Sequence, residues 1–455
     1  MTLTLALLLL YSALQVGLGV WIGRRVRTGG DFFVAGRGLS AGLVFSAFLA
    51  ANIGAGSTVG ATAVGYSDGL SAWWRNGSAG LGSLVLAFWI GPLIWREARM
   101  HGDLTVGDFL ERHYGRVMRG VVGALIWCGT LSILAGQLIG VAAVLRVAGG
   151  VPAHFGYLAG ALVAVAYFVG GGLLSSSWVN RVQLLFILTG FALVTPVALN
   201  LAGGVGAVTA APEAGFLGGG SAVGWRYIFI LGPAFIVSPG LLQRSFAGRD
   251  ASAVRTGIAL NGVVLLMFAF VPALLGMSAK LLYPNLAAPD LALPALMSGA
   301  LPPAIGALAL AAVFSAEIST ADAVLFMLAT SASRDLYAGF INRSATDAQL
   351  VRVARLAAVA GAGAGIALAF VFASVVAALD AFYALLTVTL FVPVIGALHV
   401  KTRARDGLMA VGFGLPALAA VYLLTDGLGY GVVTPALAGI IASATGFAAA
   451  RVTRS

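Results

Sequence analysis

Residues 40–66 read SAGLVFSAFLAANIGAGSTVGATAVGY, a stretch without a charged residue. It is long enough to cross the ~30 Å hydrocarbon core of a bilayer as a helix. The run is interrupted at 52–57 (NIGAGS), where two glycines disfavour a continuous helix, because Gly costs about 1 kcal/mol in a helix interior. The stretch therefore predicts a membrane span made of two half-helices.

The composition of the whole chain agrees with a membrane location. The 455 residues are 60% hydrophobic and only 9% Asp, Glu, Lys and Arg, against about 25% charged residues in a soluble domain. Gly occupies 62 positions, and small residues let membrane helices approach closely. Cys128 is the single cysteine, so neither an intramolecular disulfide nor a Cys-based metal site is expected. These features exclude an ordinary soluble enzyme and predict an all-α integral membrane protein.

Thirteen apolar segments recur between clusters of charge. They are continuous, which excludes a β-barrel, whose strands alternate over ~10 residues. The expected spans are 2–23, 40–66, 70–96, 118–149, 151–172, 176–201, 222–247, 252–279, 301–335, 351–372, 374–398, 406–424 and 431–450. The connection 104–119 is amphipathic and is expected to form an interfacial helix.

The basic residues predict the orientation. Residues 1–4 contain no basic residue, whereas Arg24, Arg25 and Arg27 follow the first segment, so we expect a retained helix with its N-terminus outside. In this arrangement 22 of the 26 Lys and Arg residues lie in inner connections. The net charge of +10 thus indicates a multi-pass protein of the inner (plasma) membrane with a cytoplasmic C-terminus, and not a nucleic-acid partner.

A second interrupted segment indicates internal symmetry. Segment 222–247 contains Gly232-Pro233 and Ser238-Pro239-Gly240, and Pro costs about 3 kcal/mol in a helix interior. Broken helices at matching places in two inverted five-helix repeats indicate the binding site of a secondary transporter. The alternative is that Gly and Pro are simply common in membrane helices. The predicted division is 1–39 (first helix and inner loop), 40–201 (repeat 1), 222–398 (repeat 2) and 399–455 (two C-terminal helices).

The segment 301–335 carries a polar stripe. At 100° per residue, Ala316, Ser319 and Thr320 share one face of a helix. Hydroxyls beside an unwound backbone with free carbonyls supply the oxygen ligands that a hard monovalent cation such as Na⁺ prefers. The alternative is that both hydroxyls bond to carbonyls of their own helix.

Two carboxylates, Glu317 and Asp322, flank this stripe on opposite sides. A carboxylate at bilayer depth costs at least ~2.5 kcal/mol, so each should face protein or water and have a purpose. The candidate purposes are offsetting the charge of the cation, relaying protons, or pairing with an arginine such as Arg181. Asp380, near the outer end of its segment, is expected to be an interfacial residue.

Several short motifs together resemble the sodium:solute symporter family, from about residue 2 to 400. They are 31–37 (DFFVAGR), 50–53 (AANI), 171–173 (GGL) ahead of 178–183 (WVNRVQ), 243–247 (QRSFA), and 319–322 (STAD) running on to 334–337 (RDLY). The resemblance implies the LeuT-type fold of two inverted five-helix repeats, with one helix before and two after them. It also implies a sodium site formed by backbone carbonyls and two hydroxyls, at Ala50, Ile53, Ala316, Ser319 and Thr320.

The chain departs from this family at two positions. Asn180 stands where many members have Asp, a residue linked to ion exit or to a second sodium site, and Asn cannot supply a charge. Glu317 stands where an apolar or small residue is expected, so it is a candidate for adjusting ion choice or admitting a proton. The polar residues of the sugar carriers after the first-helix break are also absent, which disfavours a sugar substrate.

The leading hypothesis is a sodium-coupled importer that works by alternating access, with Na⁺, a small solute and the bilayer as partners, acting as a monomer. Half-helix N-termini favour a carboxylate, so an organic acid or amino acid is expected, and Arg75 at the outer mouth agrees. The alternative is a proton-coupled transporter in which Glu317 and Asp322 titrate. An enzyme is not expected, because the four His residues are dispersed. Candidate substrate residues are Asn52, Gly56, Ser57, Trp74, Gln137 and Ser238.

Overall fold

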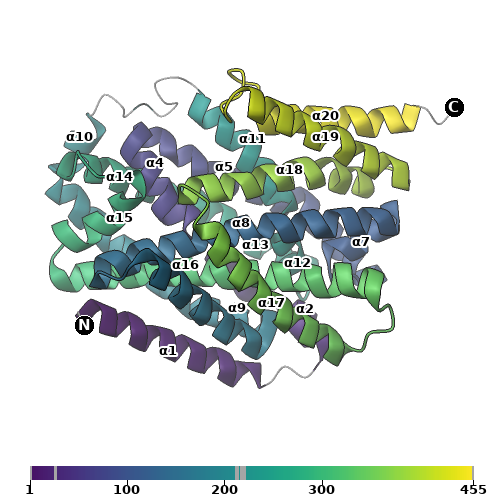
Figure 1. Ribbon diagram of the computed structural model, residues 1–455, viewed down its shortest axis with the longest axis horizontal. Helices are drawn as coiled ribbons and strands as arrows, with labels where there is room; N and C mark the ends of the chain where they lie inside the picture. The colour runs from purple at the N-terminus through teal and green to yellow at the C-terminus, as the bar shows by residue number, and fades with distance from the viewer. Residues whose placement is uncertain (1–2, 25–27, 211–214, 216–221, 453–455) are drawn as a thin grey trace.

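The computed structural model describes residues 3–24, 28–210, 215 and 222–452, and within these ranges the chain is almost entirely helical. The long helices run side by side, and the two termini lie at opposite ends of the bundle (Figure 1). Eleven helices of the described part are long and apolar enough to cross a membrane. This confirms the predicted all-α membrane class. Arg25 and Arg27 lie outside the described residues.

The helices are α1 (Leu3–Gly23), α2 (Gly29–Val34), α3 (Ala41–Asn52), α4 (Ala61–Asp68), α5 (Trp73–Val85), α6 (Gly91–His101), α7 (Val106–Tyr114), α8 (Arg116–Gly149), α9 (Ala153–Leu201), α10 (Gly204–Thr209), α11 (Ala222–Val237), α12 (Pro239–Phe246), α13 (Ala251–Phe268), α14 (Phe270–Leu282), α15 (Ala292–Ala295), α16 (Pro303–Thr330), α17 (Asp347–Ala369), α18 (Val375–His399), α19 (Ala404–Leu424) and α20 (Pro435–Val452). Wider π-type turns form η2 (Gly56–Gly60) and η7 (Ser331–Ile341).

The number of long apolar helices is smaller than the thirteen predicted segments, for local reasons. The apolar helix α3 is shortened by the break that follows it, and the first part of α9 (Ala153–Ala166) is also short. A left-handed Gly172 (φ 54°) kinks α9 there, and a Cβ at this position would lie 2.6 Å from the ring of Phe32. The two parts of α9 are therefore separate helices that meet at Gly172, which agrees with the predicted segments 151–172 and 176–201.

Both predicted interruptions are present. After α3, Ile53 has extended backbone angles (φ −94°, ψ 91°), and the chain resumes helical turns at η2. The side chain of Ser57 closes the break, since its Oγ accepts from the backbone N–H of Gly54 at 2.9 Å. In the predicted segment 222–247, α11 ends at Val237, and Pro239 begins α12, where its missing N–H costs nothing.

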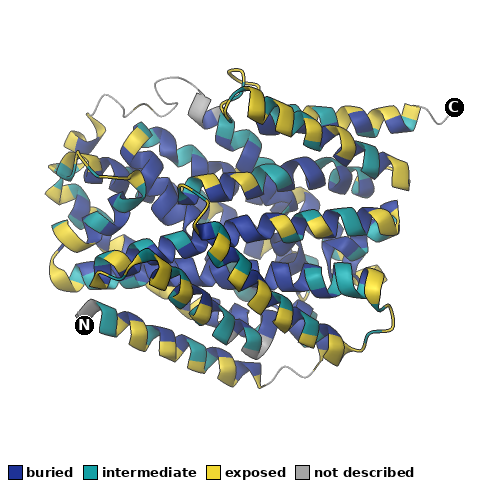
Figure 2. Ribbon diagram, in the orientation of Figure 1, coloured by how far each residue is buried: buried dark blue, intermediate teal, exposed yellow. Residues whose placement is uncertain are grey.

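The helix α16 lies in the core of the bundle. Every residue from Ala312 to Thr330 is buried, whereas α1, α19 and α20 expose one side each to the surroundings (Figure 2). A helix that is buried on all sides can carry polar groups only if neighbouring elements satisfy them. The amphipathic connection is also as predicted, because α7 buries Val106, Phe109 and Leu110.

A candidate sodium and solute site

The two hydroxyls of the polar stripe on α16 meet the last turn of α3. Ser319 Oγ lies 2.9 Å and Thr320 Oγ1 3.2 Å from the carbonyl oxygen of Ala50. Ser319 Oγ also lies 2.9 Å from the carbonyl of Ala316 in its own helix. Ile53 is fully buried at the break. The structure thus brings together Ala50, Ala316, Ser319 and Thr320, with Ile53 on the turn that follows.

This arrangement suits a hard monovalent cation. Its oxygens are hydroxyls and carbonyls about 3 Å apart, as in the ligand set of a cation that coordinates oxygen at about 2.4 Å. The five predicted ligand residues are at most 5% exposed. Within the described residues no group of three or more His, Cys, Asp or Glu could hold a metal ion. The oxygen set is therefore neutral, and a single positive charge is its natural complement.

Gly54 allows this close approach of the broken segment to α16. A Cβ at Gly54 would lie 2.2 Å from Thr320 Oγ1 and 2.7 Å from Gln137 Oε1, closer than real Cβ contacts. Gln137 on α8 accepts a hydrogen bond from the N–H of Ala55 at 2.8 Å, which satisfies a backbone donor freed by the break. The predicted substrate residue Gln137 therefore also supports the unwound backbone.

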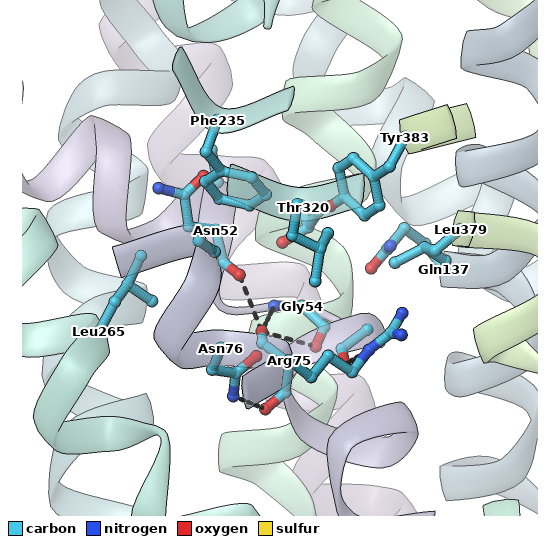
Figure 3. A pocket seen from close by; sticks show the side chains of 15 residues that line it. Asn52, Gly54, Arg75, Asn76, Gln137, Phe235, Leu265, Thr320, Leu379 and Tyr383 are labelled. Carbon is cyan, nitrogen blue, oxygen red and sulfur yellow. Dashed lines mark hydrogen bonds between the residues drawn. The ribbon is translucent and has the colours of Figure 1, made fainter. Parts of the chain in front are cut away.

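Two small cavities lie beside the break in α3. The first has a volume of about 20 Å³, room for about one water molecule, and the second about 40 Å³. The first is lined by Ala51, Asn52, Gly54, Gly56, Ser57, Arg75, Asn76, Ala79, Gln137, Leu231, Phe235, Leu265, Thr320, Leu379 and Tyr383 (Figure 3). Cavities this small have no room for an organic solute, so a lining helix must move before a solute can enter. We call this arrangement the closed form.

The cavities account for five of the six predicted substrate residues. Asn52, Gly56, Ser57 and Gln137 line the first cavity, and Ser238 lines the second together with Asn52. Trp74 lines neither of these two. Its ring packs edge-on against that of Trp73, with centroids 5.1 Å apart, and faces Gly224.

An aromatic pair lies between the two cavities. The rings of Phe235 on α11 and Tyr383 on α18 have centroids 5.6 Å apart, and both residues line both cavities. Figure 3 shows the two rings on either side of Thr320. The two elements that carry this pair thus meet next to the candidate ion site.

Asp380 is not the interfacial residue that the sequence predicted, because it is buried in an ion pair with Arg75. Arg75 is 2% and Asp380 7% exposed, and Arg75 Nη1 lies 3.0 Å from Asp380 Oδ1. Arg226 Nη2 contacts the other carboxylate oxygen at 3.1 Å. A lone Arg within an otherwise uncharged span was the sequence signal for a buried group, because an isolated charge at that depth needs a partner.

Arg75 and its neighbour Asn76 hold the broken segment from α5. Arg75 Nε donates to the carbonyl of Gly56 at 2.9 Å, and Asn76 Nδ2 donates to the carbonyl of Ser57 at 2.9 Å. Both carbonyls belong to the turn where helical hydrogen bonding is disrupted. Two adjacent residues of α5 therefore fix one side of the first cavity.

The two carboxylates of α16 point to different neighbours, as their helical positions predict. Glu317 Oε1 lies 2.9 Å from Thr58 Oγ1, whereas Asp322 Oδ2 accepts from Ser176 on α9 at 2.5 Å. No described Lys, Arg or His pairs with Glu317. Arg181 is exposed and lies over the ring of Trp178, so it is not the partner of Glu317.

Asn180 lies one turn after Ser176 on α9 and is 1% exposed. Within the described part of the chain, neither its amide nitrogen nor its amide oxygen has a hydrogen-bond partner. The carboxylate at this contact between α9 and α16 is Asp322.

An ionic cluster joins α7 and α8 to η7 at the other end of the bundle. Arg119 contacts Glu111 at 2.5 Å and Asp108 at 2.8 Å, and it lies 3.5 Å from Asp335. Thr105 Oγ1 donates to the same Asp335 oxygen at 2.6 Å. Close by, burial raises the pKa of Asp103, which pairs with Arg112.

Similarity to known proteins extends over most of the chain. The Vibrio parahaemolyticus sodium/glucose cotransporter is 25% identical over 405 residues, 77% of this chain and 71% of the relative. The high-affinity proline transporter PutP of Bacillus subtilis is 24% identical over 360 residues, 75% of this chain and 76% of the relative. The solved substrate-bound, outward-open state of a Na⁺-coupled sialic acid symporter superposes with a TM-score of 0.83 at 18% identity, covering 99% of this chain and 97% of the other.

The structural likeness shows the expected LeuT-type fold. The sequence likeness reaches further, because residues 32–413 match the model of the sodium:solute symporter family. Members of this family are secondary transporters and not enzymes, and they couple a solute to sodium across a membrane. The chain belongs to the sodium:solute symporter family.

Proposed function

We propose that this protein imports a small organic solute by sodium-coupled symport, with Na⁺ bound by Ala50, Ile53, Ala316, Ser319 and Thr320. The observation that carries the proposal is the convergence of two hydroxyls of α16 on a carbonyl of the broken helix α3. Sodium binding there ties α3 to α16. Since coupling between two sites is reciprocal, sodium raises solute affinity by the same factor as the solute raises sodium affinity.

The solute is an organic acid or an amino acid in preference to a sugar. The first cavity lies at the broken end of a helix, where the helix dipole favours a negative group. One of its lining residues, Arg75, is the only cationic side chain among them. The relatives named above include a proline transporter and a glucose cotransporter, so their names alone do not select a class.

The second candidate is a proton-coupled version of the same mechanism, and the contact between Thr58 and Glu317 favours it. Thr58 Oγ1 lies 2.8 Å from the carbonyl of Gly54 and 2.9 Å from Glu317 Oε1, yet a hydroxyl has a single proton to donate. Both contacts are hydrogen bonds when Glu317 is protonated and donates to Thr58. This geometry supports a proton on Glu317 in the closed form. Asp322 and Asn180 remain further candidates for coupling.

The proposal includes the orientation of the protein in the membrane. The N-terminus lies outside the inner membrane and the C-terminus in the cytoplasm, which fits their positions at opposite ends of the bundle (Figure 1). The first cavity then faces the outside, and the cluster around Arg119 faces the cytoplasm. The protein acts as a monomer.

The test uses purified protein at constant ionic strength, with NaCl compared with choline chloride. Sodium should raise the melting temperature, since a ligand that binds only the folded state stabilises it by mass action. The variant Ser319→Ala/Thr320→Ala should lose this shift, whereas Thr330→Ala, another buried threonine of α16, should keep it. Tracer uptake into proteoliposomes under a sodium or a proton gradient then separates the two coupling modes. Uptake that ignores sodium, or a sodium shift that survives in the double variant, would refute the assignment.

A further inference from the structure

We propose that Arg75 Nη2 binds a carboxylate group of the transported solute in the first cavity; this rests on the proposed symport function and adds its specificity-determining residue. The guanidinium has three hydrogen-bonding nitrogens, of which Nε donates to Gly56 and Nη1 to Asp380. Nη2 makes no hydrogen bond of good geometry among the described residues, although the side chain of Tyr227 lies beside the guanidinium. Leaving a buried, charged donor unsatisfied is costly, so this position is suited to an acceptor that arrives from outside.

Arg75 Nη2 lies at the wall of the first cavity. Arg75 lines the first cavity together with Gly56 and Leu379, and a Cβ at Gly56 would lie 3.6 Å from Nη2. The guanidinium is held in place by its two other bonds and by the ring of Tyr227, whose centroid is 5.1 Å from Cζ. A rigid donor fixed before binding loses little entropy when a carboxylate arrives.

The lining of the cavity also favours an anion. Arg75 is the cationic side chain among the lining residues, and Gln137, Asn76 and Ser57 supply polar but neutral groups around the rest of the cavity. Asp380 contacts both Arg75 and Arg226, and Asp68 and Asp290 lie within electrostatic range of these arginines, but none of the three carboxylates lines the cavity. A solute carboxylate would give Nη2 a charged acceptor, whereas a neutral polyol would not.

Access to Nη2 depends on α18. Leu379 of α18 lies over Gly56, where the distance from its Cδ2 to an ideal Cβ would be only 2.2 Å. The next residue on α18 is Asp380, the partner of Arg75. Withdrawal of α18 therefore uncovers the face of Gly56 next to Nη2 and loosens the ion pair in one movement. The solute carboxylate can then reach the guanidinium before α18 closes again.

The experiment measures thermal stabilisation of the full-length protein by acetate and lactate, each compared with its neutral isostere, acetamide or lactamide. All titrations contain NaCl at constant ionic strength, and a parallel series in choline chloride reports sodium binding separately. The acids should stabilise the parent, and the amides should not. In Arg75→Gln, where Asp380 keeps Arg226 as its partner, acid affinity should fall about tenfold or more, as expected for a charged hydrogen bond.

Two further variants separate recognition from structural support. Arg226 also contacts Asp380 but does not line the cavity. The variant Arg226→Gln should therefore keep the preference for acid over amide. Arg75→Lys keeps a positive charge beside Asp380 but has a single terminal nitrogen, and should lose most of that preference. Equal binding of acid and amide by the parent, no acid binding, or acid binding that survives in both Arg75 variants would overturn the proposal. A missing sodium shift in the parent would instead refute the symport function.

Discussion

The closed form of the first cavity depends on Leu379 lying between two glycines. A Cβ at Gly136 would lie 2.2 Å from Leu379 Cδ1, and one at Gly56 would lie 2.2 Å from Cδ2. Because each methyl group faces a glycine backbone, the side chain cannot turn away from one without striking the other. Gly136→Ala should therefore push α18 off α8. Overpacking of this kind costs about 1–3 kcal/mol.

This cost falls on the closed form, since the overlap disappears when α18 withdraws. The open population should therefore rise between about fivefold and 150-fold, because every 1.4 kcal/mol is a factor of ten. The assay is the rate at which a maleimide labels Ala79→Cys, a buried position on the cavity wall, in a Cys128→Ser background. Labelling of the purified protein should accelerate by the same factor.

The compensating variant makes this prediction specific. Leu379→Ala removes both methyl groups that would clash, so Gly136→Ala/Leu379→Ala should not show the overlap effect seen with Gly136→Ala alone. The matched control is Gly363→Ala on α17, where a Cβ meets nothing within 4 Å, and its labelling rate should equal that of the parent. An unchanged rate in Gly136→Ala, or an equal acceleration with Leu379 present and with Leu379 replaced, would refute the reasoning.

Three further substitutions test other contacts. Gly54→Ala should abolish the sodium-dependent melting shift although it removes no ligand, because its Cβ would lie 2.2 Å from Thr320 Oγ1; a retained shift would contradict the site geometry. Glu317→Gln keeps the shape of a protonated carboxyl, so sodium-driven tracer uptake should persist while any stimulation by a proton gradient is lost; loss of sodium-driven uptake would instead assign the ionised carboxylate to Na⁺. Arg119→Met leaves Glu111 and Asp335 without their cation and should lower the stability by about 3 kcal/mol, measured by denaturation in detergent; a change below 1 kcal/mol would contradict a stabilising role.

Much of the fold was predictable because the bilayer simplifies the sequence signal. Spanning segments must be apolar and continuous, so hydropathy alone locates most of them. The two interruptions were also visible, since 52–57 and 238–240 combine Gly or Pro with polar residues. The boundary between segments 151–172 and 176–201 was predicted, but its physical basis was not, because the turn at Gly172 depends on Phe32, which approaches from a distant part of the chain.

The candidate ion site was predictable for a similar reason, and the candidate solute site only in part. Ser319 and Thr320 lie on one helix, so helical periodicity alone places them together. Arg75 and Asp380 are more than 300 residues apart in the chain, and each taken singly resembles an interfacial charge. Their burial follows from their pairing, which no local pattern encodes.

The charges placed in the membrane bear on how such a transporter would be driven. Moving one net charge across the membrane is worth about 2.3 kcal/mol per 100 mV. A single Na⁺ bound by neutral oxygens adds one positive charge to the moving complex, and a solute carboxylate on Arg75 adds one negative charge. The loaded protein then carries the same net charge as the empty one, so the membrane potential contributes nothing to net transport. In that case the sodium concentration gradient alone supplies the driving force, whereas a zwitterionic amino acid at the same site would make the cycle respond to voltage.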